Sequence, residues 1–256
     1  MPIRVLSAAW LACGALLPAI GGAKSPYDYL DDLGDYARAP LHWDSHDWAW
    51  AGASAAAVAA AYSVDGRVRS HVMTGGVSVG QDPHSLRDAA PLLALTASTY
   101  AIGRLRHDDG TARIGVDMAE ATVLGVLSAT VIKVAVGRDR PNETPTRSAW
   151  REGGDSFPSG HVTAAFAAAQ VFAAQMPRGQ WGWRVLAYGL AGATAYARLD
   201  SNVHWLSDTV AGAALGIATG RFVSGRAHAD LAEPRVSMQV VPLEHGALLS
   251  FQVRTD

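Results

Sequence analysis

The sequence predicts an all-α protein, a bundle of six core helices followed by a short C-terminal β-hairpin. Apolar, alanine-rich runs recur between polar interruptions from Trp48 to Val223. Within that region no run alternates apolar and polar residues as a half-buried strand would. The chain has 256 residues, of which 49% are hydrophobic and 17% charged, so it can bury a substantial core. Helices packed on helices are therefore expected.

Residues 1–23 have the pattern of a secretory signal peptide. A basic start at Arg4 precedes an apolar run from Val5 to Ile20, and Gly21 to Ala23 are small enough for cleavage. The run also approaches the length of a membrane anchor, which is the alternative interpretation. Cys13, the only cysteine, lies inside this segment, so the cleaved chain would have no disulfide, thiol nucleophile or thiolate metal site.

The helical domain is expected at 24–225. It would start with an amphipathic helix within 25–47, and a Gly- and Ser-rich loop would follow at about 74–88. Asp65–Gly66 is expected to end the first core helix, and His107–Gly110 to break the chain after the second. The six core helices are expected at 48–64, 89–106, 114–136, 162–176, 183–197 and 203–223.

Residues 226–256 form a tail in which a hairpin is predicted, with its turn at Glu244–Gly246. Apolar residues alternate with polar ones on both sides of this turn, at Val236, Met238 and Val240 and again at Leu249, Phe251 and Val253.

Most of the apolar runs are shorter than the roughly 20 residues of a membrane span, and alanine drives insertion only weakly. We therefore expect a soluble bundle, secreted to the periplasm. An enzyme integral to the inner membrane, with its site facing the periplasm, is the alternative. The net charge of −2 indicates no global attraction to nucleic acid, so any anion site must come from a local cluster of bases.

Two acidic groups could carry chemistry but have simpler explanations. Asp117 and Glu120 fall on the early turns of an expected helix, where acidic residues are favoured. The other group lies at a helix junction, where solvated or capping roles are expected, and consists of His42, Asp44, His46 and Asp47. The sequence therefore predicts no metal site and no cofactor.

Three short clusters of cationic and imidazole side chains stand out between Lys133 and Asp208. In the first, Lys133 is near the end of a helix and Arg140 precedes Pro141 just beyond it. A lysine supplies a compact charge and an arginine a bidentate fork, a combination that suits a phosphate with several oxygens. Taken alone, such a pair would more often be surface charges.

In the second cluster Ser159 and Gly160 begin a helix directly after Pro158. The free N–H groups at a helix start bind anions, the Ser159 hydroxyl can donate another hydrogen bond, and Gly160 allows close approach. His161 at the rim could protonate a leaving oxygen. An ordinary helix cap is the alternative.

In the third cluster His204 and Asp208 are four residues apart, so on a helix they would share one face. The carboxylate could then bond one imidazole nitrogen and leave the other available for attack. Arg198 could return to clamp the same anion. A purely structural pair is the alternative.

The pattern Lys-x6-Arg-Pro, Pro-Ser-Gly-His, Arg-x5-His-x3-Asp resembles the three-part signature of the type 2 phosphatidic acid phosphatase and vanadium-dependent haloperoxidase superfamily, in its bacterial phosphatase branch. The resemblance covers the helical body but neither the signal segment nor the tail. It implies the helical bundle of the acid phosphatase and vanadium haloperoxidase type. One departure is Ala197, where the family usually has serine, which puts the fine geometry of Arg198 in doubt.

The resemblance also implies residue roles. His204 would be the nucleophile that forms a phosphohistidine, Asp208 would orient it, and His161 would protonate the leaving group. Phosphoryl oxygens would be bound by Lys133, Arg140, Ser159, Gly160 and Arg198. By this resemblance hydrolysis needs no metal.

The expected function is a metal-independent phosphatase acting on a phosphomonoester or pyrophosphate. The substrate would be a lipid phosphate, such as phosphatidate or a polyprenyl diphosphate, or a soluble phosphomonoester, with membrane association possible and no nucleic-acid partner. The alternatives are a vanadate-dependent haloperoxidase, with His204 as the vanadium ligand, and a non-catalytic phosphate-binding protein. The sequence leaves the oligomeric state open.

Overall fold

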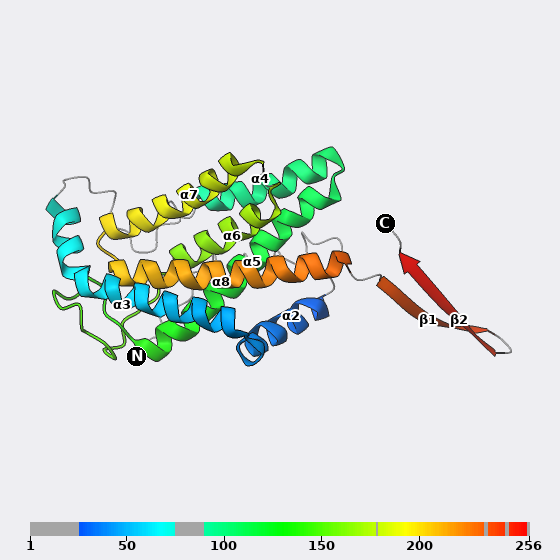
Figure 1. Ribbon diagram of the computed structural model, residues 1–256, viewed down its shortest axis with the longest axis horizontal. Coiled ribbons are helices and arrows are strands. Elements are labelled where there is room, and N and C mark those ends of the chain that lie inside the picture. Colours follow the sequence, from blue (N-terminus) through cyan, green and yellow to red (C-terminus); the bar gives the residue numbers. More distant parts are fainter. Residues whose placement is uncertain (1–25, 75–89, 178, 233–234, 244–245, 255–256) are drawn as a thin grey trace.

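The computed structural model describes residues 26–74, 90–177, 179–232, 235–243 and 246–254, so the signal segment and nearly all of the expected loop at 74–88 lie outside the described residues. The prediction of an all-α body is confirmed. Six long helices build it (Figure 1), namely α3 Ser45–Thr74, α4 Ala90–Arg106, α5 Asp109–Val136, α6 Gly160–Gln175, α7 Trp181–Asp200 and α8 Leu206–Ala232.

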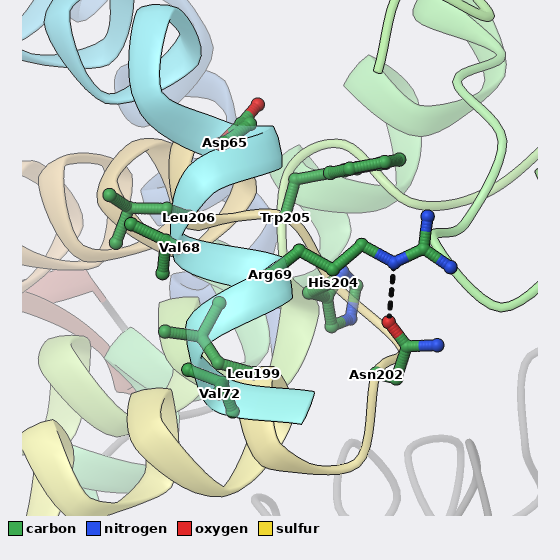
Figure 2. Close-up of a pocket in the computed structure, with 9 residues that line it drawn as sticks. All are labelled: Asp65, Val68, Arg69, Val72, Leu199, Asn202, His204, Trp205 and Leu206. Atoms are coloured by element: carbon green, nitrogen blue, oxygen red, sulfur yellow. Dashed lines mark hydrogen bonds between the residues drawn. The ribbon is translucent and has the colours of Figure 1, made fainter. Parts of the chain in front are cut away.

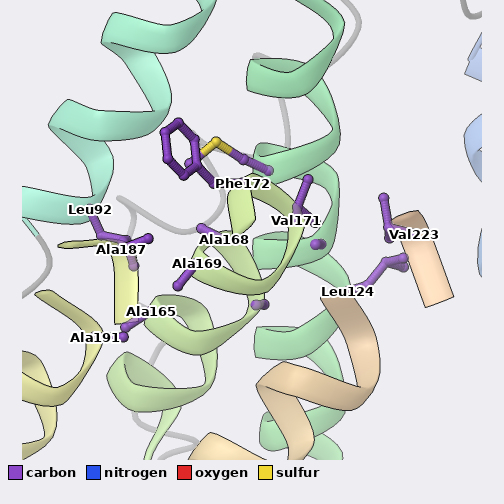
Figure 3. Packing of buried hydrophobic residues seen from close by; sticks show 13 residues of the cluster. Leu92, Leu124, Ala165, Ala168, Ala169, Val171, Phe172, Ala187, Ala191 and Val223 are labelled. Carbon is purple, nitrogen blue, oxygen red and sulfur yellow. The ribbon is translucent and has the colours of Figure 1, made fainter. Parts of the chain in front are cut away.

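Helix α6 lies at the centre of the bundle and packs against α4, α5, α7 and α8. Half of its 16 residues are buried alanines or valines, including Ala165, Ala168 and Val171. They meet apolar side chains from the surrounding helices, such as Leu124 of α5 and Ala187 of α7 (Figure 3). Because alanine is short, the helices around α6 approach closely, which makes the bundle a rigid support.

Helix α8 approaches α6 along a line of glycines four residues apart, Gly212, Gly216 and Gly220. A Cβ at Gly216 would lie 2.4 Å from the carbonyl oxygen of Thr163, and one at Gly212 would lie 2.7 Å from that of Ser159. These distances are too short for any side chain, so only glycine permits this contact. The contact fixes the start of α6 beside the first turns of α8.

The amphipathic helix expected within 25–47 is present as α2 Pro26–Arg38, followed by the 3₁₀ turn η1 Ala39–His42. The Tyr36 ring meets Phe222 edge to face at 5.2 Å. The Tyr36 hydroxyl is 2.8 Å from Thr219 Oγ1 and accepts a hydrogen bond from Ser128 Oγ at 3.1 Å. Helix α2 is thereby attached to α5 and α8.

Among the expected helix boundaries that differ from the structure, two concern the site. Helix α3 does not end at Val64 but continues to Thr74, because Asp65 is buried and hydrogen-bonded instead of terminating the helix. Helix α8 begins at Leu206 and not at Val203, so His204 lies in the turn before it. Helix α8 also extends to Ala232, past the domain boundary expected at residue 225.

Several helices are longer than the apolar runs suggested: α3 has 30 residues, α5 has 28 and α8 has 27. By length alone these three helices exceed the roughly 20 residues of a membrane span, although the expectation rested on shorter apolar runs. Among the described helices, α5 meets both the length and the composition required of a membrane span. A buried core helix can have the same properties, and α5 is largely buried near its start.

In the tail, the backbone of β1 Arg235–Leu243 pairs antiparallel with β2 Gly246–Arg254, with Leu243 opposite Gly246. The strands occupy the two runs where alternation predicts a hairpin, and residues 244–245 lie outside the described residues.

The acidic group at the helix junction has the capping role expected from the sequence, whereas Asp117 and Glu120 do not lie on the first turns of their helix as expected. Asp44 Oδ1 accepts hydrogen bonds from the backbone N–H groups of His46 at 2.8 Å and Asp47 at 2.9 Å, and so caps the start of α3. Asp117 and Glu120 are buried in the first half of α5, far along the helix from Lys133. Helix α5 begins at Asp109 and not at Ile114, with Asp108 as its N-cap.

Candidate active site

The three sequence clusters converge at one end of the bundle. Lys133 lies in the last turn of α5, and Gly160 is the first residue of α6. A Cβ at Gly160 would lie 3.9 Å from Cε of Lys133, so the first two clusters are in contact. The backbone N–H of Ser159 donates to the carbonyl oxygen of Asp208 at 3.0 Å, which joins the second cluster to the third. The structure therefore brings all three clusters together.

The His204 ring is buried and lies among positive charges. Burial lowers the pKa of His204 well below its ordinary value of 6.5, and four neighbouring groups lower it further, Lys133, Arg140, Arg198 and His161. The imidazole is therefore neutral near pH 7, the form in which a ring nitrogen has a free lone pair.

Two buried donors in this cluster have no hydrogen-bond partner among the described residues, Ser159 Oγ and Arg140 Nη1. Ser159 occupies the N-cap position of α6, yet its side chain makes no capping bond. Leaving a buried donor unpaired costs about 1–3 kcal/mol, and native proteins rarely do so without a reason. These two donors mark a place for an acceptor beside the start of α6, where an anion is favoured.

Asp155 is a site residue that sequence reasoning missed. Arg140 donates to both of its carboxylate oxygens, from Nε to Oδ1 at 2.6 Å and from Nη2 to Oδ2 at 2.9 Å, and Lys133 Nζ donates to its backbone carbonyl. Partial burial acts to raise the pKa of Asp155, but the bonds and charges of these two cations hold it well below its usual range. Nothing in the sequence beyond its proximity to the second cluster distinguishes Asp155.

Lys133 has an altered pKa for a related reason. Burial lowers the pKa of Lys133 from 10.5 to about 8, and Asp155, the first of its charged neighbours, acts to raise it. Arg140 and Arg198 act in the same direction as burial. Lys133 is therefore a cation at neutral pH that loses its proton more readily than an exposed lysine.

The expected geometry of His204 and Asp208 is corrected. The two do not share a helical face, because His204 precedes α8, and His204 Nδ1 is 3.6 Å from Asp208 Oδ2, longer than a hydrogen bond. Asp208 Oδ2 instead accepts from Ser156 Oγ at 2.5 Å and from the backbone N–H of Trp205 at 2.8 Å. Burial raises the pKa of Asp208, whereas Arg138 and these donors lower it.

Arg138 and Asp65 form a second missed group behind Asp208. Arg138 donates from Nη1 to Asp208 Oδ1 at 2.5 Å and from Nη2 to Asp65 Oδ2 at 2.8 Å, and all three side chains are fully buried. The guanidinium lies over the Trp150 ring at 4.4 Å. Asp65 is missed in the sequence because Asp65–Gly66 resembles a helix end. Arg138 is missed because this residue falls between the lysine and the arginine that define the first motif.

A small pocket adjoins His204 on the side of α3 (Figure 2). Arg69 lies along it, donating from Nε to Asn202 Oδ1 at 3.0 Å and from Nη1 to the carbonyl oxygen of Thr144 at 3.2 Å. Its remaining wall is largely aliphatic, from Val68, Val72, Leu199 and Leu206. The site thus has an anion-binding cluster on one side of His204 and a small pocket with both polar and apolar walls on another.

The family model described as the PAP2 superfamily matches residues 114–229, a range that contains every predicted site residue from Lys133 to Asp208. Over these residues, less than half of its length, the chain is similar to the PAP2 superfamily. The PAP2 match includes most of α5, all of α6 and α7, and most of α8, whereas α3, which contributes Asp65 and Arg69, precedes it.

The chain is also similar to individual proteins. A lipid A 1-phosphatase of Porphyromonas gingivalis is 30% identical over 161 residues, which are 62% of this chain and 34% of that protein. The chain thus spans about a third of the length of that relative. A comparison with the crystal structure of Aquifex aeolicus LpxE gives a TM-score of 0.38 at 18% identity, covering 61% of this chain and 92% of that one.

Proposed function

We propose that this chain is a metal-independent phosphatase of the PAP2 superfamily that hydrolyses the phosphomonoester of a lipid through a phosphohistidine at His204. The observation that carries the proposal is the combination of a buried, neutral His204 with two unpartnered donors beside it, Ser159 Oγ and Arg140 Nη1. A neutral imidazole can attack phosphorus, and buried donors with no partner can receive the phosphoryl oxygens.

Substrate binding would use charges that the fold already holds in place. Lys133 and Arg198 lie close enough to His204 to act on its charge, and Arg198 is fully buried in the last turn of α7. The phosphoryl oxygens would bind these two cations, Arg140, Ser159 Oγ and the backbone N–H of Gly160. Such a preorganised set stabilises the charge on the transferring group without rearrangement.

The reaction would take two steps. A ring nitrogen of His204 forms a bond to phosphorus while the bond to the leaving oxygen breaks, and His161 gives its proton to that oxygen. His161 then takes a proton from water, the water oxygen bonds to phosphorus, and the P–N bond breaks to release phosphate and neutral His204. Because Nδ1 faces Asp208 at 3.6 Å, Nε2 is the attacking atom, and the carboxylate stabilises the positive charge that develops on the ring.

An apolar stripe beside the site supports a lipid as the rest of the substrate. On the outer face of α5, Leu127, Val131 and Val134 are exposed at 43%, 69% and 83%, and Val134 adjoins Lys133 in the chain. Exposed apolar surface of this kind commonly contacts lipid or another protein. The similarity to a protein named lipid A 1-phosphatase supports the same substrate class.

The proposal is tested by assaying the purified chain in a metal chelator against lipid phosphomonoesters, lipid diphosphates and soluble phosphomonoesters. We expect phosphate release, fastest with the lipid monoesters, and loss of it in His204→Ala. His71→Ala, which removes an exposed histidine from the end of α3, is the control and should keep full activity. Full activity in His204→Ala would refute the nucleophile, and a preference for soluble esters would refute the substrate class.

For location we propose the periplasm, with the polypeptide either free there or held in the inner membrane. The exposed apolar stripe on α5 supports contact with lipid in both cases. Fractionation of cells that express the full chain decides between them, because a free protein leaves with the periplasmic fraction and an integral one does not.

A further inference from the structure

A buried network connects helix α3 to the start of α8, outside the contacts that would touch a substrate. Asp65 Oδ1 accepts from the backbone N–H of Ser207 at 2.8 Å, and its Oδ2 accepts from Ser207 Oγ at 2.6 Å and from Arg138 Nη2 at 2.8 Å. Arg138 continues the network through Nη1, which donates to Ser207 Oγ at 2.8 Å and to Asp208 Oδ1 at 2.5 Å. We call Asp65, Arg138, Ser207 and Asp208 the Asp65 network.

The charges of this network determine how strongly Asp208 can act on His204. One guanidinium lies between two carboxylates, and all three side chains are fully buried. Buried charges are poorly screened, so each affects the others strongly. Because Asp65 shares the charge of Arg138, Asp208 keeps negative charge for its other oxygen, Oδ2, which faces His204 Nδ1.

We propose that Asp65 is a positioning residue for His204, acting through Arg138 and Asp208. The proposal rests on the proposed function, in which His204 is the nucleophile. With Asp65 neutralised, Arg138 would be balanced by Asp208 alone, and the imidazole would lose part of the negative charge that favours a proton on Nδ1, 3.6 Å from Asp208 Oδ2. Asp65 belongs to α3, outside the residues 114–229 that match the family, so this contribution comes from a part of the chain beyond the three motifs.

A purely structural tie between α3 and α8 is the competing explanation, since the same hydrogen bonds also hold the two helices together. The two explanations differ in what is lost. A structural tie affects folding and every binding step, whereas a positioning residue affects the step in which His204 reacts. The experiment therefore separates kcat from phosphate binding and from stability.

The variants are Asp65→Asn, Asp208→Asn and the double variant, in the full chain. Asparagine keeps the size of Asp65 and its acceptor for the Ser207 N–H but removes the charge beside Arg138. Asp117→Asn is the matched control, because Asp117 is also a buried carboxylate but lies near the far end of α5 from Lys133. Each variant is compared for kcat, KM, inhibition by inorganic phosphate and urea unfolding.

We expect Asp65→Asn to lower kcat by about 10- to 100-fold, the range of coupled neighbouring residues, with KM and the phosphate inhibition constant changed by less than about 2-fold. In the Asp208→Asn background it should cause no further loss, because the carboxylate through which it acts is gone. Asp117→Asn should keep wild-type kcat. An additive loss in the double variant, an unchanged kcat in Asp65→Asn, or a change confined to KM would overturn the proposal.

Two further measurements test the inference if Asp65→Asn does not fold or if the protein has no phosphatase activity. If Asp65→Asn does not fold, Ser207→Ala, which removes only the hydroxyl of the network, should reduce kcat in the same non-additive way. Nitrogen-15 NMR of the His204 ring needs no turnover: Asp65→Asn should shift the ring proton from Nδ1 toward Nε2. That shift in a protein with no phosphatase activity would refute the proposed function alone, whereas an active enzyme with an unchanged tautomer in Asp65→Asn would refute this inference alone.

Discussion

The carboxylate of Asp155 pairs with Arg140 through two hydrogen bonds, at 2.6 and 2.9 Å, and occupies the Nε and Nη2 donors that an anion would also use. Half of the Asp155 side chain is exposed and only 8% of the Arg140 side chain, so the carboxylate lies on the solvent side of the guanidinium. For an incoming phosphate, Arg140 therefore offers one nitrogen without a hydrogen-bond partner among the described residues, Nη1. The negative charge of Asp155 lies beside the same guanidinium.

Asp155→Asn should for this reason tighten inhibition by inorganic phosphate, about 3- to 10-fold at pH 6.5, since a nearby like charge opposes anion binding. The measurement is the phosphate inhibition constant against a phosphomonoester substrate. Glu143→Gln is the control, because the Glu143 carboxylate accepts from the backbone N–H of Arg140, at 3.3 Å, and not from its guanidinium. Weaker inhibition in Asp155→Asn would instead show that Asp155 orients Arg140 for the substrate.

Phosphate binding should also depend on the ionisation of Lys133. Its pKa is lowered to about 8, so it is a cation below that pH and becomes neutral above it. Affinity for inorganic phosphate should be nearly constant between pH 7 and 8 and fall by up to about 10-fold per pH unit above 8. Lys133→Arg should remove this slope, because arginine stays charged. A wild-type affinity that is flat to pH 10 would contradict the expected role of Lys133.

The neutral state of buried His204 should appear in the stability of the protein. Its pKa is lower in the folded chain than the ordinary 6.5, so below pH 6.5 the unfolded chain binds the extra proton and the folded chain resists it. The free energy of unfolding should fall as the pH drops below 6.5, by up to about 1.4 kcal/mol per pH unit from this group. Urea unfolding of wild type and His204→Asn between pH 5 and 8 isolates the effect, and identical slopes in the two proteins would contradict it.

The glycine line of α8 should be intolerant of side chains. In Gly216→Ala the new Cβ would lie 2.4 Å from the carbonyl oxygen of Thr163, which forces α6 and α8 apart. We expect a loss of about 1–3 kcal/mol in the free energy of unfolding, together with reduced kcat, because the start of α6 would move relative to His204. Gly192→Ala in α7 is the control, as a Cβ there meets no atom within 4 Å and alanine favours the helix. Equal stability of the two variants would contradict the close packing.

The sequence predicted the helices because long apolar runs have a local cause, and it predicted the three clusters because their motifs are also local. It failed where a residue acts over a long separation in the chain. Asp65 beside Gly66 has the composition of a helix end, and only its pairing with Arg138 and Ser207 keeps α3 helical through it. Because Asp65–Gly66 resembles a helix end, Asp65 could not be identified from the sequence as a residue of the site.

Ser159 and His204 show which features of the three clusters could not be predicted from the sequence. The N-cap position of Ser159 could be read from the sequence, but the absence of a capping bond from its hydroxyl could not. The spacing of His204 and Asp208 suggested one helical face, whereas the helix begins two residues after His204 because the Asp208 carboxylate receives the N–H of Trp205.

Asp208 contributes through two different groups. Its carboxylate meets Arg138, Ser156 and the approach to His204, while its backbone carbonyl receives the N–H of Ser159. A substitution at position 208 removes the first group and leaves the second. Variants of Asp208 therefore lose the carboxylate contacts to Arg138, Ser156 and the Trp205 N–H, but keep the main-chain bond that joins the start of α6 to the start of α8.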